Sequence, residues 1–509
     1  MFTDGTPRCV RRAACADAPA RIPRGLRRIL VAGVLGLIVA ACVPVAHQRT
    51  GPVTDDVPAA WSGADRAAEI GTTALSRWWL RFDDAQLASL IDQALLINTS
   101  VKSAEAALRQ ARALRDVAAA ALLPVVNSSA SALHGTSGGH STGNLFKAGF
   151  DASWEIDVFG VQRHAIDASE ASAQASATSL GDVQVSIAAE VALAYITLRS
   201  AQTRLAIATE NLASQQETLQ ITRWRAQAGL VTTLETEQAR AAAEQTAALL
   251  PALQTSIEQT VHALAVLVGR PPAALKAQLI VSAPVPQARD DLALSIPAET
   301  LRQRADVRTA EYQVAAALAK VGQAEAARWP GFALGGSLGL AASTFGSLTD
   351  SASVLSTLLA SVRLPVFDGG ALRSQVRAQQ AALDQSEQAY RAAILAALKD
   401  VEDALVSLRG DRLRLVSLRN AADAGANAAL LARQRFSSGL VDFQVVLETQ
   451  RTQLSTQDSL ASAGADVSAD HVRLYKALGG GWRSEVSHDA PSAATSLHAA
   501  EKISRNSKP

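Results

Sequence analysis

The residues that most often carry out chemistry in proteins are few in this chain and poorly spaced for catalysis. Its 509 residues include eight histidines, which follow no metal-ligand spacing, and only three cysteines, Cys9, Cys15 and Cys42. The chain contains no GxSxG motif, phosphate-binding loop or dinucleotide fingerprint. We therefore predict that the protein is not an enzyme, that it binds no metal and that no disulfide joins its body.

Cys42 lies at the end of a segment typical of secreted proteins. Four arginines between residues 21 and 28 precede an uncharged apolar run from Ile29 to Ala46, the layout of a secretory signal peptide. The Val-Ala-Ala-Cys sequence ending at Cys42 resembles a bacterial lipobox, in which the thiol receives a diacylglyceryl group. This predicts a signal peptide over residues 1–41 and a lipid anchor on Cys42. The alternative is an uncleaved anchor, because about 18 uncharged residues could nearly span a bilayer.

The composition favours long helices. Hydrophobic residues make up 48% of the chain, charged residues 19% and aromatic residues 4%, and the formal net charge is +1. The abundant alanine, leucine, glutamine and arginine lose little conformational freedom in a helix. A nearly neutral chain has no electrostatic reason to bind a polyanion, so we expect no nucleic-acid partner.

The sequence also contains an internal duplication. Residues 104–124 (AEAALRQARALRDVAAAALLP) align with residues 310–330 (AEYQVAAALAKVGQAEAARWP), and RWRAQAGLV aligns with RQRFSSGLV so that Gly229 matches Gly439. Two landmarks in the same order predict two structural repeats. We therefore divide the chain into a signal peptide at 1–41, an extended linker at 42–77, a first repeat at 78–285, a second repeat at 286–482 and a disordered tail at 483–509.

Each repeat contains a candidate strand pair joined by a loop rich in glycine and serine. Residues 146–158 alternate between apolar and polar side chains, which places the two kinds on opposite faces of a strand. We predict strand pairs at about 124–158 and 331–366.

A long helix is predicted after each strand pair. Neither 161–228 nor 370–437 contains proline, and at about 1.5 Å per residue each helix would reach on the order of 100 Å. Large apolar residues recur in both at the seven-residue spacing of coiled coils, and the helices would turn back at Gly229 and Gly439. The seam residues are Val191, Leu198, Leu205, Leu212 and Leu219 in the first helix and Ile394, Val401, Leu408 and Leu415 in the second. A cytosolic coiled-coil scaffold would explain these seams, but not the signal or the strands.

Four candidate membrane strands are too few to close a barrel by themselves. The smallest transmembrane barrels have about eight strands, and each unpaired backbone group facing lipid costs several kcal/mol. The chain must therefore share a barrel with copies of itself. Three copies would supply twelve strands, continued by a helical tube, although the counting alone permits other multiples.

Several motifs in a fixed order resemble those of the TolC-like outer-membrane efflux proteins, and most closely the lipoprotein branch that works with resistance-nodulation-division pumps. They are WWLRFDDAQL (78–87), ALLP (121–124), WEIDVFG (154–160), LPVFDGG (364–370), RFSSGLVDFQVVLETQR (435–451) and YKALGGGW (475–482).

The resemblance implies a mixed α and β membrane protein, mainly α, that is lipid-anchored in the outer membrane. Its homotrimer would form a shared 12-stranded β-barrel that continues into a long periplasmic α-helical coiled-coil barrel. Its partners would be outer-membrane lipid, a periplasmic adaptor and an inner-membrane pump. One departure is Ala305, where the family often has proline, which leaves the start of that helix less firmly set.

The resemblance also assigns candidate site residues. In the family the hairpin tips close the channel and meet the adaptor, and the inner aspartate ring aligns with Val445 and Glu448. The first repeat has Thr232 and Gln238 where the second has Asp442 and Glu448, so we expect these carboxylates only at the second tip. The candidate tip and gate residues are Arg225, Gly229, Arg435, Gly439, Asp442 and Glu448.

An inward-facing Asp442 or Glu448 would form a ring of like charges by threefold symmetry. The alternative is an ordinary solvated helix face. We assign Trp154 and Phe159 to the membrane interface, with packing at the strand ends as the alternative.

The predicted function is the passive exit duct of a tripartite efflux pump for drugs or other small solutes. One alternative is a duct for type I protein secretion, which Cys42 and the LGGGW ending disfavour. The other is a non-conducting tether between the outer membrane and the cell wall or other proteins.

Overall fold

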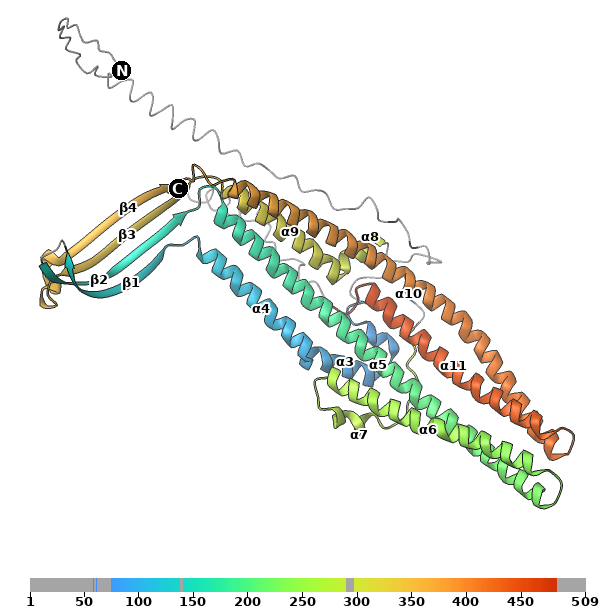
Figure 1. The fold of residues 1–509 in the computed structure, drawn as a ribbon. Helices are drawn as coiled ribbons and strands as arrows, with labels where there is room; N and C mark the ends of the chain where they lie inside the picture. The colour runs from blue at the N-terminus through green and yellow to red at the C-terminus, as the bar shows by residue number, and fades with distance from the viewer. Residues whose placement is uncertain (1–57, 59–60, 62–74, 138–140, 290–296, 483–509) are drawn as a thin grey trace, which may run out of the picture. The chain divides into compact units, whose positions relative to one another are not determined.

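The structure is a computed structural model that describes residues 58, 61, 75–137, 141–289 and 297–482. The predicted signal peptide, Cys42 and the tail after Trp482 lie outside these residues. In the first half the elements are η1 (Trp78–Phe82), α3 (Ala85–Ile97), α4 (Thr99–Ala120), β1 (Val125–Ser137), β2 (Ser141–Ile156), α5 (Val161–Gln227), α6 (Thr233–Leu267), η2 (Pro272–Leu275) and α7 (Lys276–Leu279) (Figure 1). In the second half they are α8 (Pro297–Gln303), α9 (Ala305–Ala326), β3 (Gly331–Ala342), η3 (Gly346–Thr349), η4 (Ser351–Ser353), β4 (Val354–Arg363), α10 (Ala371–Ser437) and α11 (Phe443–Ala477).

The two internal repeats are matched helix by helix. α4 and α9 have 22 residues each, α5 and α10 have 67 each, and α6 and α11 have 35 each. α5 is long and apolar enough to cross a membrane by length and composition, but half of its most apolar window is buried against the rest of the protein. Its apolar residues therefore serve packing between helices.

The four strands form one antiparallel sheet in the order β1-β2-β3-β4. The two hairpins are joined by pairing of β2 with β3, which runs from Phe146 opposite Ala342 to Ile156 opposite Phe332. β1 and β4 are the edges of this sheet, and each pairs with one neighbour only among the described strands. A four-stranded sheet with two open edges is the arrangement predicted for one share of a larger barrel.

The helices continue the order of the strands. α5 packs against α4, α6 and α9, and α10 packs against α9 and α11. α4 and α10 are therefore the outermost members of the row that contains α4, α5, α9 and α10. The predicted seams lie in these contacts: Val191, Leu198 and Val401 are fully buried, while Leu205 and Leu415 are partly exposed.

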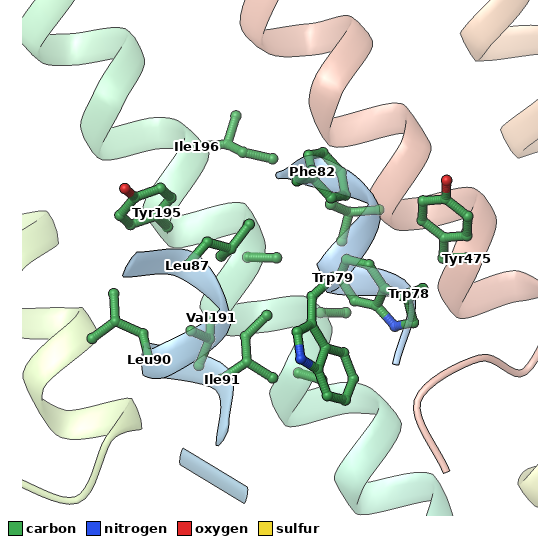
Figure 2. Close-up of a cluster of buried hydrophobic side chains, with 14 of the residues drawn as sticks. Trp78, Trp79, Phe82, Leu87, Leu90, Ile91, Val191, Tyr195, Ile196 and Tyr475 are labelled. Atoms are coloured by element: carbon green, nitrogen blue, oxygen red, sulfur yellow. The ribbon is translucent and has the colours of Figure 1, made fainter. Parts of the chain in front are cut away.

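The largest apolar cluster lies where η1 and α3 fill the space between α5 and α11 (Figure 2). The ring of Trp78 stacks on Tyr475 with centroids 5.4 Å apart. Asp84 begins α3 by accepting hydrogen bonds from Gln86 N and Leu87 N, and its other oxygen accepts from the Tyr195 hydroxyl at 2.9 Å. Fully burying a large apolar side chain contributes about 1.5–3 kcal/mol, so this cluster holds α3 and α5 against α11.

The start of α9 is held by the residue before it. Arg304 donates to Asp306 at 2.7 Å, to Asp400 of α10 at 3.1 Å and to the carbonyl of Ala477 at 2.9 Å. These bonds fix the backbone at Ala305 without a proline. The expectation that this helix start is less firmly set was wrong, because an ion-pair network supplies the constraint.

Candidate functional site

The ends of the two long helical hairpins have the same backbone geometry. Gly229 has φ +74° and Gly439 has φ +72°, a left-handed conformation that favours glycine. In each turn the amide of the next residue donates to the helix end: Leu230 N to Arg225 O and Leu440 N to Arg435 O, both at 2.8 Å. Both glycines therefore end helices, in the way their repeated sequence suggests.

Arg225 links the first tip to the second. Its guanidinium donates to the carbonyls of Phe436 and Ser437, each at 3.1 Å, and lies 4.3 Å from the centroid of the Phe436 ring. Arg435 occupies the same place in the second repeat, but its side chain is exposed. The repeat is thus symmetric in backbone and asymmetric in the contact made by its arginine.

The two tips also differ in how their second helices begin. Thr232 and Glu235 form a capping box at the start of α6, in which Thr232 N donates to Glu235 Oε2 at 2.8 Å. The hydrogen bond from the Thr232 side chain lowers the pKa of Glu235. At the start of α11, Asp442 makes no side-chain capping bond and is exposed, as is Glu448. The expectation of carboxylates at the second tip alone overlooked Glu235, which lies three residues after Thr232.

A polar ladder joins the first hairpin to the second. Its four α5 residues, Arg204, Asn211, Thr218 and Arg225, are spaced seven residues apart, so they lie on one side of the helix. Their partners are, in order, Asp458 at 2.6 Å, Gln457 at 2.8 Å, Gln450 at 3.0 Å and the two carbonyls already described.

The ladder is buried in its middle and open at its ends. Asn211, Thr218 and Gln450 are buried, whereas Arg204 and Asp458 are each 37% exposed. Where water can enter, it replaces the partner in a hydrogen bond at little net cost in free energy. The ladder between α5 and α11 can therefore separate more readily than an apolar seam between helices. Sequence reasoning missed this ladder, although Arg204, Asn211 and Thr218 each directly precede a predicted seam leucine.

The family described as outer membrane efflux protein matches residues 90–270 and 296–480. The chain belongs to this family. The family, fold class, outer-membrane location and efflux-channel function predicted from the sequence are thereby confirmed.

Individual proteins are similar in sequence to this chain over nearly their whole length. The pyoverdine export outer membrane protein OpmQ of Pseudomonas putida is 34% identical over 441 residues, covering 84% of this chain and 93% of that protein. Nodulation protein T of Rhizobium leguminosarum bv. viciae is 30% identical over 467 residues, covering 89% and 93%. The solved structure of the outer-membrane channel OprN is 36% identical, with a TM-score of 0.77, over 84% of this chain and 99% of that one.

At the other end of the efflux protein, the two predicted interface aromatics pack where strands meet helices. Trp154 donates from Nε1 to the carbonyl of Leu122 at 2.8 Å. Phe159 stacks on Trp329 with centroids 5.6 Å apart. Each is 37% exposed, so each packs at the strand end and still presents part of its ring to the surroundings.

No cluster of three or more possible metal ligands occurs among the described residues of this efflux protein. The structure brings Arg225 to the second tip, leaves Arg435, Asp442 and Glu448 exposed, and places both glycines in the turns. The tips and the ladder together are the candidate site.

Proposed function

We propose that three copies of this chain close one shared β-barrel and one helical tube, and that this trimer is the passive exit duct of a tripartite efflux pump. The observation that carries the proposal is the four-stranded sheet with two unpaired edges. Pairing β4 of each protomer with β1 of the next satisfies every edge, and three protomers give twelve strands.

The outermost helices support the same closure. Exposed apolar side chains remain on both α4 and α10, the two helices at the ends of the row. They include Leu114 and Val117 on α4 and Val406, Leu413 and Val416 on α10. Ring closure that pairs β4 with β1 brings the first part of α10 in one protomer beside α4 of the next and removes Leu114 and Val117 from water.

In this proposal the hairpin tips close the duct. The Arg225 contact and the ladder hold the second hairpin against the first, and separation of the hairpins widens the periplasmic end. A periplasmic adaptor meets the tips and connects the duct to an inner-membrane pump of the resistance-nodulation-division type, which supplies the energy. Asp442 and Glu448 would contribute negative charge at this entrance.

We also infer that Cys42 carries the lipid anchor and that the mature chain begins there. The support is the arginine-rich segment, the apolar run and the small residues before the cysteine. Radiolabelled palmitate should be incorporated into the wild-type protein and not into Cys42→Ser, while the amount of protein in the outer membrane is compared by immunoblot. Equal labelling of both would contradict the assignment.

The exported solute belongs to the class of small molecules. OpmQ is named for pyoverdine export, and a 29% identical relative from Pseudomonas putida is named for toluene efflux. Relatives of similar identity thus differ widely in cargo, so the shared residues serve conduction rather than recognition of one compound.

The decisive experiment is accumulation of several fluorescent efflux dyes in cells that lack this gene, with and without a restored wild-type copy. We expect accumulation to rise in the deletion and to fall again on restoration. Unchanged accumulation with the protein present in the outer membrane would contradict the duct and favour the non-conducting tether or the protein-secretion duct.

A further inference from the structure

All charged side chains of the sheet lie on one face. β2 carries Lys147, Asp151 and Glu155, and β4 carries Arg363, whereas β1 and β3 contain no lysine, arginine, aspartate or glutamate. The strand register places all four charges on the same face. The other face presents mainly apolar side chains, including Val126, Phe146, Phe150, Trp154, Leu334, Leu338, Leu358 and Val362.

The charged face would line the lumen of a closed barrel, because transmembrane barrels turn their apolar face to lipid. Gly149 of β2 is paired with Gly339 of β3 on this face. A Cβ added at Gly149 would lie 2.7 Å from the Gly339 Cα, and one added at Gly339 would lie 2.8 Å from the carbonyl oxygen of Ala148. Only glycine therefore permits β2 and β3 to approach this closely at the pair.

Asp151 is surrounded by uncharged polar groups. The register aligns it with Asn127 of β1, Ser337 of β3 and, through Ser337, Thr357 of β4. The Ser129 hydroxyl donates to Asp151 Oδ2 at 3.1 Å. No ion pair involving Asp151 occurs among the described residues, so no described basic side chain neutralises its charge.

Lys147 lies four residues from Asp151 on the same strand and face, farther from the helices. At about 3.4 Å per residue the two residues are about 14 Å apart along the strand. A strand tilt of about 40° leaves about 10 Å between the two levels along the barrel axis, which still exceeds the Debye length of about 8 Å at physiological ionic strength. The two charges therefore act on a passing solute separately.

We propose that Asp151 forms a ring of three carboxylates on the barrel wall that favours cationic solutes at its level, and that Lys147 forms an opposing ring nearer the outer opening that favours anionic ones. A solute of high net charge of either sign meets one repulsive ring, so the barrel selects against such solutes. The inference rests on the trimeric barrel of the proposed function.

Charged thiol reagents can test the two rings in the intact protein. Residues 43–509 contain no cysteine, so a single introduced cysteine can be followed in outer membranes of intact cells against the unsubstituted protein. Asn127→Cys reports on Asp151, its register partner, and Ser131→Cys reports on Lys147. Ser128→Cys, paired with Phe150, is the control on the apolar face. The probes are a cationic trimethylammonium and an anionic sulfonate methanethiosulfonate of similar size.

We expect the ratio of cationic to anionic reaction rates to be about tenfold higher at Asn127→Cys than at Ser131→Cys. Asp151→Asn should lower the ratio at the first position at least about threefold, and Lys147→Gln should raise it at the second by a similar factor. Ser128→Cys should react slowly with both reagents.

Equal ratios at the two positions, or ratios unaffected by Asp151→Asn, would overturn the charge rings. Fast reaction at Ser128→Cys would overturn the assignment of the two faces. These outcomes are independent of dye accumulation, which can fail while the rate ratios behave as expected. Failure of the rings is thus distinguishable from failure of the efflux duct.

Discussion

The guanidinium of Arg225 lies 4.3 Å from the ring centroid of Phe436, whereas Arg435, its counterpart in the second repeat, is exposed. A cation-π contact and two hydrogen bonds from a charged donor together contribute about 1–3 kcal/mol. Because Phe436 belongs to α10 and Arg225 to α5, this free energy favours the state in which the hairpins touch.

Arg225→Ala should therefore raise the fraction of time that the duct is open about tenfold. The measurement is the time-averaged single-channel conductance of the purified protein in planar bilayers. The conductance of Arg225→Lys should lie between those of the wild type and Arg225→Ala. Lysine keeps the charge but cannot donate to two carbonyls as a planar fork. Arg435→Ala is the matched control and should change the conductance less. Wild-type conductance in Arg225→Ala would show that the contact does not restrain the tips.

The ion pair at the other end of the ladder offers a test by charge reversal. Arg204 Nε and Asp458 Oδ1 are 2.6 Å apart, and a second bond of 3.0 Å makes the pair bidentate. Because both side chains are about one third exposed, we expect a coupling free energy of only about 0.5–1 kcal/mol.

The measurement is a double-mutant cycle on the unfolding free energy with Arg204→Glu, Asp458→Arg and the double variant. The single changes should destabilise the protein, and the reversed pair should recover most of the loss. Additive effects of the two changes would mean that the pair contributes nothing to holding α5 against α11.

A buried carboxyl between α10 and α11 should make stability depend on pH. The Asp470 side chain is 1% exposed, and its Oδ1 accepts from Arg473 at 2.6 Å. Burial raises the pKa of Asp470, and the nearby Asp411 carboxyl raises it further, while Arg473 opposes the rise. Asp411 in turn lies near Arg414, at 3.5 Å.

A raised pKa in the folded state means that the folded protein binds the proton more tightly than the unfolded chain. The stabilisation that the bound proton gives the folded protein is therefore complete at a pH below the ordinary aspartate pKa of about 3.9. It is lost as the pH rises through the raised pKa of Asp470. Asparagine at this position cannot ionise. The melting temperature of Asp470→Asn minus that of the wild type should therefore increase as the pH is raised from 4 to 8. A constant or falling difference for Asp470→Asn would contradict this interpretation.

The repeats, strand pairs, seams and turns could be predicted because each follows from local periodicity. Seven-residue spacing defines the seam at Val191 and Leu198, and the glycines at 229 and 439 define where the chain reverses. The pairing of β2 with β3 and the Arg225 contact could not be predicted in this way. They depend on how one hairpin is rotated against the other, and Arg204 or Thr218 alone is indistinguishable from a solvated residue on a helix.

The carboxylates of the second tip are best tested through their effect on cations. Asp442 and Glu448 are both exposed in one protomer, and threefold symmetry would place three copies of each at one level, where like charges attract divalent cations. If Glu448 faces the lumen, Glu448→Gln should reduce block of the conductance by a divalent cation such as Mg²⁺ about threefold or more, and Asp442→Asn tests the second position in the same way. Glu244→Gln, an exposed carboxylate on α6, is the matched control. Equal block in the wild type and in both tip variants would show that these carboxylates lie on an ordinary solvated face.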